Sequence, residues 1–102
     1  MRVIKPSTLQ AYWTKHRDTR IPLMQWLVKA RAARWQSIDD VRQTYPHADA
    51  VQVASGATVT VFNIKGNTYR LIVAIHYNTQ IVFIRDFLTH AEYDKNQWKE
   101  WH

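Results

Sequence analysis

The stretch Thr58–Leu88, TVTVFNIKGNTYRLIVAIHYNTQIVFIRDFL, decides the fold of this chain. It holds three largely apolar runs of strand length, and two short polar breaks separate them. The first break contains Gly66, which can adopt the positive φ of a hairpin turn. The pattern therefore predicts an antiparallel meander. Its strands are Thr58–Ile64, Tyr69–Tyr77 and Ile81–Leu88, and its turns are Lys65–Asn67 and Asn78–Gln80.

The residues before the meander have helical periodicity instead. Met1–Ile4 is a short extended start, and STLQ at Ser7–Gln10 fits a capping box that opens a first helix. Pro22 suits the first turn of a second helix. A third helix is expected over Ser37–Thr44, followed by a loop over Pro46–Gly56. The apolar faces of the first two helices predict a helical hairpin. They are formed by Leu9, Tyr12, Trp13 and His16 in the first helix, and by Leu23, Trp26, Leu27 and Ala30 in the second.

The residues after the meander predict a final helix. THAE at Thr89–Glu92 fits a second capping box, so this helix should begin near His90. Trp98 and Trp101 follow in a polar tail. They can anchor a partner or pack back on the sheet, and packing is the preferred interpretation.

Length and composition narrow the class of protein. The 102 residues fit a single domain, expected over residues 1–102, and 46% of them are hydrophobic, which favours a packed core over disorder. There is no cysteine, so no disulfide forms and a structural zinc site is disfavoured. No apolar leader or membrane-spanning run is present. A cytoplasmic protein without a membrane partner is expected.

The formal charge of +6 is unevenly distributed along the chain. Residues 1–45 contain nine Lys or Arg and three Asp or Glu, whereas residues 46–102 contain five of each. Such a basic patch can bind a polyanion or an acidic protein, and it can equally be a solvated helical face. The excess comes chiefly from Lys15, Arg17, Arg20, Lys29, Arg31 and Arg34.

Two arginines interrupt the apolar strands. Strict alternation places Arg70 with Ile72, and it places Arg85 on the side of Phe83 and Phe87. An arginine inside a sheet is costly to bury without a partner, so the pair suggests an anion-binding groove on one face. Alternatively, each arginine pairs with a carboxylate such as Asp86 or Glu92, or extends to solvent.

His90 and Tyr93 stand where the last strand gives way to the last helix. A histidine titrates near neutral pH and can transfer a proton there, and a tyrosine can stack on a nucleobase. Taken singly, His90 can simply cap the helix and Tyr93 can simply pack.

A metal site or a bound cofactor is the alternative to proton transfer by His90. His90 and Asp94 are spaced i, i+4, but no further ligand follows at a recognisable spacing. No nucleophilic serine motif, phosphate-binding loop or dinucleotide-binding glycine pattern is present. We therefore expect neither a metal nor a cofactor.

Two blocks of the sequence resemble a known family. FN-x-x-GN-x-YR at Phe62–Arg70 and IR-x-x-x-THAEYD at Ile84–Asp94 resemble the HigB-type toxins of type II toxin–antitoxin systems, within the RelE-like superfamily. Weaker similarities lie in MRVI at the start, around Trp35–Asp40 and in YPHAD at Tyr45–Asp49. The resemblance implies an α+β fold, with an N-terminal helical hairpin packed on an antiparallel sheet and a short C-terminal helix.

The resemblance also implies an activity. RelE-like toxins are ribosome-dependent mRNA endonucleases that use no metal, because the RNA 2′-hydroxyl attacks the adjacent phosphate. It assigns Arg70 and Arg85 to the charge of the transition state, and His90 and Tyr93 to proton transfer or substrate orientation. It leaves open which of His90, Tyr93 and Lys65 is the general base. The residues expected to bind RNA are Asn63, Lys65, Asn67 and Glu92.

The implied partners are a HigA-like helix-turn-helix antitoxin, the ribosome and mRNA, with the toxin and antitoxin forming a hetero-oligomer. Lys29, Arg31 and Arg34 are the candidate contacts with the antitoxin or ribosome. Two rival functions remain. One is a non-catalytic module that blocks translation by occupying the ribosome or RNA, and the other is an interaction protein whose basic hairpin only holds an acidic partner.

Overall fold

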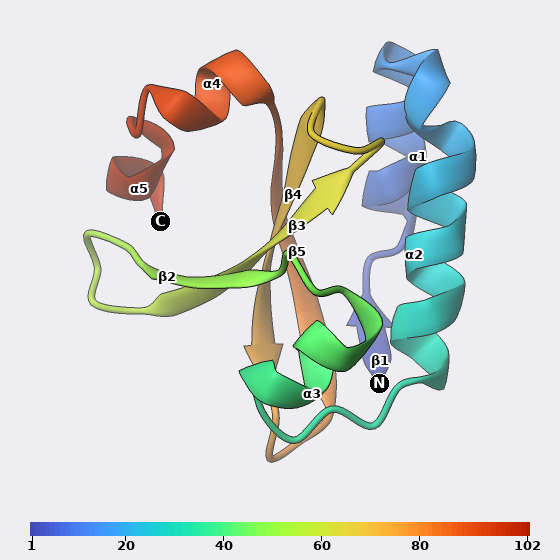
Figure 1. The fold of residues 1–102 in the computed structure, drawn as a ribbon, viewed down its shortest axis with the longest axis vertical. Helices are drawn as coiled ribbons and strands as arrows, with labels where there is room; N and C mark the ends of the chain where they lie inside the picture. The colour runs from blue at the N-terminus through green and yellow to red at the C-terminus, as the bar shows by residue number, and fades with distance from the viewer.

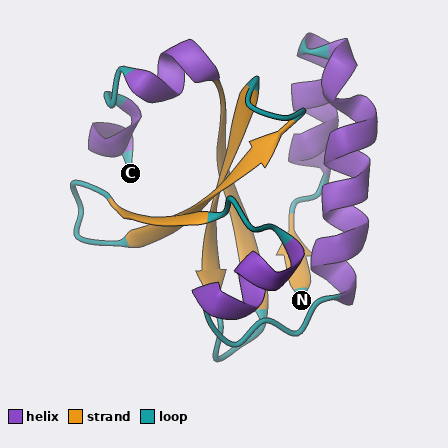
Figure 2. Ribbon diagram, viewed as in Figure 1, coloured by secondary structure: helices purple, strands orange, loops and turns teal.

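The computed structural model describes residues 1–102 and has an α+β architecture, with helices on both faces of one sheet (Figures 1 and 2). The sheet has five strands in the order β1-β5-β4-β3-β2. The strands are β1 (Arg2–Ile4), β2 (Asp49–Gln52), β3 (Thr58–Ile64), β4 (Tyr69–His76) and β5 (Ile81–Thr89). The helices are α1 (Ser7–Lys15), the 3-10 turn η1 (Arg17–Thr19), α2 (Arg20–Ala32), α3 (Ile38–Thr44), α4 (His90–Asp94) and α5 (Trp98–Trp101).

The predicted meander is confirmed, and two strands extend it. Strands β3, β4 and β5 pair antiparallel within one residue of their expected bounds, and both Lys65 and Gly66 have positive φ in the first turn. Strand β1 pairs parallel with the beginning of β5. The prediction of a loop over Pro46–Gly56 was wrong for β2, which pairs antiparallel with β3. Only Val51 of β2 is even half-buried, so this edge strand has no apolar alternation to reveal it.

The helical hairpin α1–α2 covers one face of the sheet (Figure 1). Trp26 and Leu23 of α2 are fully buried there, and the Trp26 ring meets Phe62 of β3 at 5.5 Å between centroids. This face carries the larger of two apolar clusters, and its burial fixes the hairpin to the sheet. The capping box predicted at Ser7–Gln10 was wrong. Helix α1 has Pro6 at its N-cap and no side-chain capping bond.

The other face of the sheet, which we call the far face, carries Arg70, Ile72 and Leu88 and is partly covered by the C-terminal segment. Trp98 is fully buried there against Ile72 and Leu88, which confirms that it packs. Trp101 is 64% exposed, so for this side chain the packing prediction was wrong. The chain end lies beside the β2–β3 loop, where Ser55 donates a hydrogen bond to the backbone oxygen of His102 (Figure 1).

A β-bulge interrupts the pairing of β4 with β5. Ile72 pairs with Asp86 while the next residue, Val73, pairs with Ile84, so Arg85 has no partner. The extra residue reverses the alternation beyond it. Phe87 therefore lies on the helical-hairpin face, and the prediction that Arg85 and Phe87 share a face was wrong.

Candidate functional site

Arg70 lies at the start of β4 on the far face and is 8% exposed. Its Nη1 donates to the backbone oxygens of Asn67 (3.1 Å) and Tyr69 (3.2 Å), and its Nη2 donates to the side-chain oxygen of Asn67. The guanidinium carbon lies 5.3 Å from the centroid of the Tyr93 ring. A guanidinium has five N–H donors, so Nε and one proton of Nη2 remain for another acceptor. The sheet therefore holds a fixed cation that keeps unused donors.

Tyr93 of α4 lies between this cation and the buried Trp98. Its ring stacks on Trp98 with centroids 5.2 Å apart and an interplanar angle of 18°. Burial raises the pKa of Tyr93, as do the charges of Asp49 and Asp94, while Arg70 opposes the shift. The phenol is therefore protonated at neutral pH, and it can donate a proton but is a poor base.

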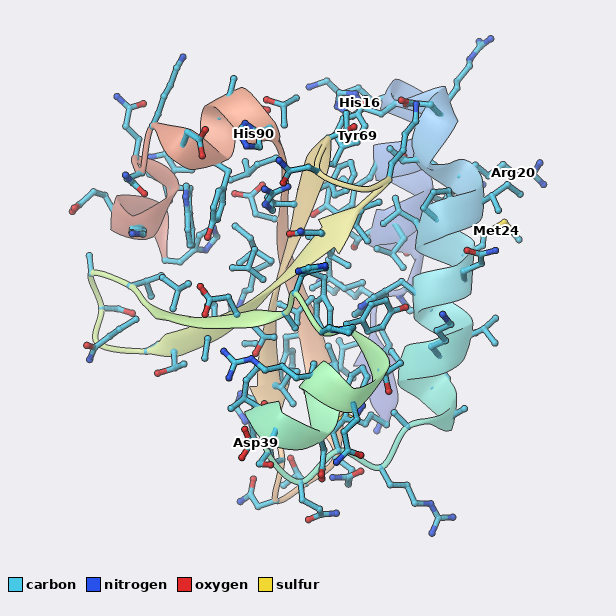
Figure 3. The ribbon with its side chains drawn as sticks, viewed as in Figure 1. His16, Arg20, Met24, Asp39, Tyr69 and His90 are labelled. Atoms are coloured by element: carbon cyan, nitrogen blue, oxygen red, sulfur yellow. The ribbon has the colours of Figure 1, made fainter.

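His90 begins α4, as the sequence predicted. Its amide donates to the backbone oxygen of Thr68 (2.9 Å), which ties α4 to the β3–β4 hairpin. The imidazole Nδ1 lies 3.1 Å from a carboxylate oxygen of Asp94, and the side chain is 45% exposed. Figure 3 shows His90 at the same end of the molecule as Tyr69. When Nδ1 holds the proton facing Asp94, Nε2 is the free acceptor.

Glu92 is exposed, and its carboxylate caps helix α4. Its carboxylate accepts from the Thr89 amide (3.0 Å), and its own amide donates to the Thr89 hydroxyl (3.2 Å), so the predicted capping box is confirmed. The Thr89 backbone hydrogen bond is the main cause that lowers the pKa of Glu92.

The cap makes the stability depend on pH, and Glu92→Gln tests it. The pKa of Glu92 is lowered in the folded state, so its contribution is present above the ordinary value of 4.5 and is lost as pH falls through the folded pKa. At neutral pH we expect the free energy of unfolding of wild type to exceed that of the variant by less than about 1 kcal/mol, because the carboxylate is exposed. Urea unfolding at neutral and acidic pH measures the difference. Glu100→Gln is the control and should show no such cap-dependent trend.

Arg85 is exposed on the far face and free of ion pairs. Neither Asp86 nor Glu92 pairs with it, because Asp86 contacts His102 at 3.2 Å and Glu92 caps α4. Its nearest aromatic neighbour is Phe83, 6.0 Å from the guanidinium carbon. Since Leu88 is the strand partner of Arg70, the two arginines stand roughly 10 Å apart along the sheet. They share a face without touching.

The three hairpin residues separate into two groups. Asn67 binds Arg70 directly, and Asn63 is the strand partner of Arg70 on β3. Lys65 instead points toward the helical hairpin, where its ammonium lies 2.7 Å from a carboxylate oxygen of Asp18. The hydrogen bond between them lowers the pKa of Asp18 and raises that of Lys65.

Sequence reasoning missed the residues around this ion pair. The Tyr69 hydroxyl donates to Asp18 at 3.2 Å, and the His16 ring lies 5.0 Å from the Tyr69 ring (Figure 3). Tyr69 in turn stacks on Phe87 at 5.2 Å. Asp18 and Lys65 are 47 residues apart, so no local pattern could have joined them.

The three basic residues expected to contact a partner do not form one patch. The Lys29 ammonium lies 5.4 Å from the Tyr45 ring centroid. Arg31 and Arg34 line a cavity at the chain start, beside Met1. Burial, followed by the charge of Arg34, lowers the pKa of the Met1 amino group.

Two further findings concern the metal and membrane predictions. His90 and Asp94 pair, but no third histidine, aspartate or glutamate joins them or any other such pair. The longest helix has 13 residues, and none has the length and hydropathy needed to cross a bilayer.

A helical hairpin on one face of a mostly antiparallel sheet, with a short helix after the last strand, is the fold of a small RelE-like domain. The chain belongs to the HigB toxin family, described as the RelE-like toxic component of a toxin–antitoxin system, whose model matches residues 19–96. The matched residues run from Thr19, directly before α2, to Asn96, two residues after α4, and include Arg70, Arg85, His90 and Tyr93. The protein is thus a toxin with an antitoxin partner. No individually curated protein matches the chain.

Proposed function

We propose that this toxin, as a single domain of residues 1–102, is a ribosome-dependent mRNA endonuclease of the cytoplasm. The observation that carries the proposal is the Arg70 guanidinium, which is fixed by Asn67 and Tyr93 yet keeps two N–H donors. A preorganised cation of this kind suits a phosphate that gains negative charge in a transition state. A HigA-like helix-turn-helix antitoxin would restrain the activity.

In the proposed reaction the RNA 2′-oxygen forms a bond to the adjacent phosphorus, and the bond from phosphorus to the 5′-oxygen breaks. Nε2 of His90 accepts the proton of the 2′-hydroxyl, with Asp94 holding Nδ1. Tyr93 donates a proton to the departing 5′-oxygen, which fits a phenol whose pKa is raised. Arg70 and Arg85 stabilise the charge on the phosphate oxygens. The products are a cyclic phosphate and a 5′-hydroxyl.

The surroundings support a need for the ribosome. Residues 46–102 carry no net charge, and Glu92 and Asp94 stand beside the proposed groups. Affinity for free RNA grows with the number of phosphates that cations neutralise, so this site should hold naked RNA weakly. Tight cleavage of purified RNA without ribosomes would contradict the requirement.

Mapping new 5′ ends of cellular mRNA after brief induction tests the proposal. Wild type should produce cuts inside translated frames, and these should disappear in Arg85→Ala and when translation is blocked before initiation. The Arg85 side chain is exposed and unpaired, so its removal should leave the fold intact. Arg42→Ala, which removes an exposed arginine paired with Asp49, is the matched control and should still cut.

One observation favours the rival, a non-catalytic module that blocks translation. Three of the five N–H donors of Arg70 already form hydrogen bonds with Asn67 and Tyr69, which is what a purely structural arginine would do. Growth arrest without new mRNA ends would establish that function instead.

A further inference from the structure

The outer face of α2 exposes an unusual amount of apolar surface. Ile21 is 56% exposed, Met24 40% and Val28 68%, and they are three of the four large hydrophobic side chains exposed on the protein. Their spacing of three and four residues aligns them along one side of the helix. Figure 3 shows Met24 pointing away from the rest of the molecule. We call these three residues the apolar stripe.

Cations flank the apolar stripe on both sides. At 100° per residue, Arg20 and Arg31 fall on one side of it and Lys29 on the other. Figure 3 shows Arg20 extending outward next to Met24. The segment RIPLMQWLVKARA contains no acidic residue, and none of the three cations forms an ion pair.

We infer that the apolar stripe binds an amphipathic helix of the antitoxin, one with an apolar seam and acidic residues on both flanks. The stripe is narrow and runs about 11 Å along α2, roughly two helical turns, which matches the ridge of another helix. The unpaired cations determine the charge of the partner, since acidic flanks would complement Arg20, Lys29 and Arg31. The inference rests on the proposed function, because it names the partner that restrains the toxin.

Other occupants fit the surface less well. A second copy of the chain would bring the same cations against one another across a two-fold axis, and like charges disfavour that contact. RNA would satisfy the cations but not the apolar centre. A membrane-bound helix needs a wide apolar face, whereas Leu23 and Trp26 of α2 are buried against the sheet.

Calorimetric titration of the full-length toxin with its cognate antitoxin tests whether the apolar stripe contributes to binding. Val28→Glu should weaken binding at least tenfold, which is about 1.4 kcal/mol. Ala50→Glu adds the same charge at an exposed site on β2 and should stay within about twofold of wild type. Because Val28 is exposed, the variant should keep the wild-type melting temperature. If it does not fold, Val28→Gln replaces it, with a weaker loss expected. Unchanged affinity in a folded variant would overturn the inference.

A pair of designed helical peptides tests the charge. Both carry leucines at the seam positions, one with glutamate flanks and the other with lysine flanks. Wild type should prefer the acidic peptide, and the triple variant Arg20→Glu, Lys29→Glu, Arg31→Glu should reverse the preference. Lys99→Glu reverses a charge on α5, across the sheet from α2, and should not change it. If the triple variant still prefers the acidic peptide, the inference is overturned. It is also overturned if the toxin self-associates, or binds anionic vesicles, in a way that is lost in Val28→Glu.

Measuring mRNA cleavage by the same variants separates the two proposals. A toxin that binds the antitoxin through the stripe but cuts no mRNA would refute the endonuclease and leave this inference standing. A toxin that cuts mRNA, and whose Val28→Glu variant binds the antitoxin with unchanged affinity, would support the endonuclease and refute this inference.

Discussion

Arg70→Ala is expected to lower the rate of ribosome-dependent mRNA cleavage by about 10²–10³-fold. The loss follows because this side chain is the fixed cation of the proposed site, and Arg85 alone, roughly 10 Å away along the sheet, cannot replace it. Arg70→Lys should recover little of this rate, since an ammonium cannot reproduce the planar fork that binds Asn67 and lies over the Tyr93 ring. Single-turnover cleavage of mRNA on programmed ribosomes is the measurement.

Removal of Arg70 also disturbs the fold, so the rate needs a structural control. Asn67→Ala takes away one acceptor of the guanidinium and loosens the hairpin while leaving the cation in place. If the two variants lose similar stability but only Arg70→Ala loses most of its rate, the arginine acts on the reaction. Equal losses of rate in both would assign Arg70 a structural role.

His90→Ala is expected to cost about 10²–10⁴-fold in the same assay, the usual contribution of a general base. Asp94→Asn should cost less, because it keeps the imidazole in place and removes only the charge that favours the Nδ1 proton. The single-turnover rates of the two folded variants are compared at one fixed pH. A folded His90→Ala variant that cleaves at the wild-type rate would remove this residue from the mechanism.

Much of the sheet could be predicted because its central strands are apolar runs of strand length, separated by short polar turns. Thr58–Ile64 matched its strand at both ends, and the return strand was one residue too long. Strand β2 could not be found in this way, since its residues are mostly exposed and its position depends on pairing with β3. The capping box predicted at Thr89 is present, whereas the similar pattern at Ser7 forms none because Pro6 is the N-cap of that helix.

The candidate site was predictable where neighbours in sequence are neighbours in space. Arg70 and Asn67 are three residues apart, and His90 and Asp94 are four apart. The position of Lys65 was not predictable, because its partner Asp18 belongs to the helical hairpin and only the fold unites them. The predicted faces of β5 failed beyond Arg85 for a related reason. A bulge depends on the neighbouring strand and has no local signal here.

The bulge has a consequence for how this protein tolerates insertions and deletions. Arg85 is the one residue of β5 that the β4 pairing does not use. Shortening the chain by that residue would leave Phe83 and Asp86 on the far face, and Ile84 and Phe87 on the helical-hairpin face, as they are now. Removing Ile84 or Phe87 would instead take a side chain out of the core packing and shift the strand register. The sheet pairing can therefore spare this one position, whereas the proposed cleavage needs the guanidinium that the position carries.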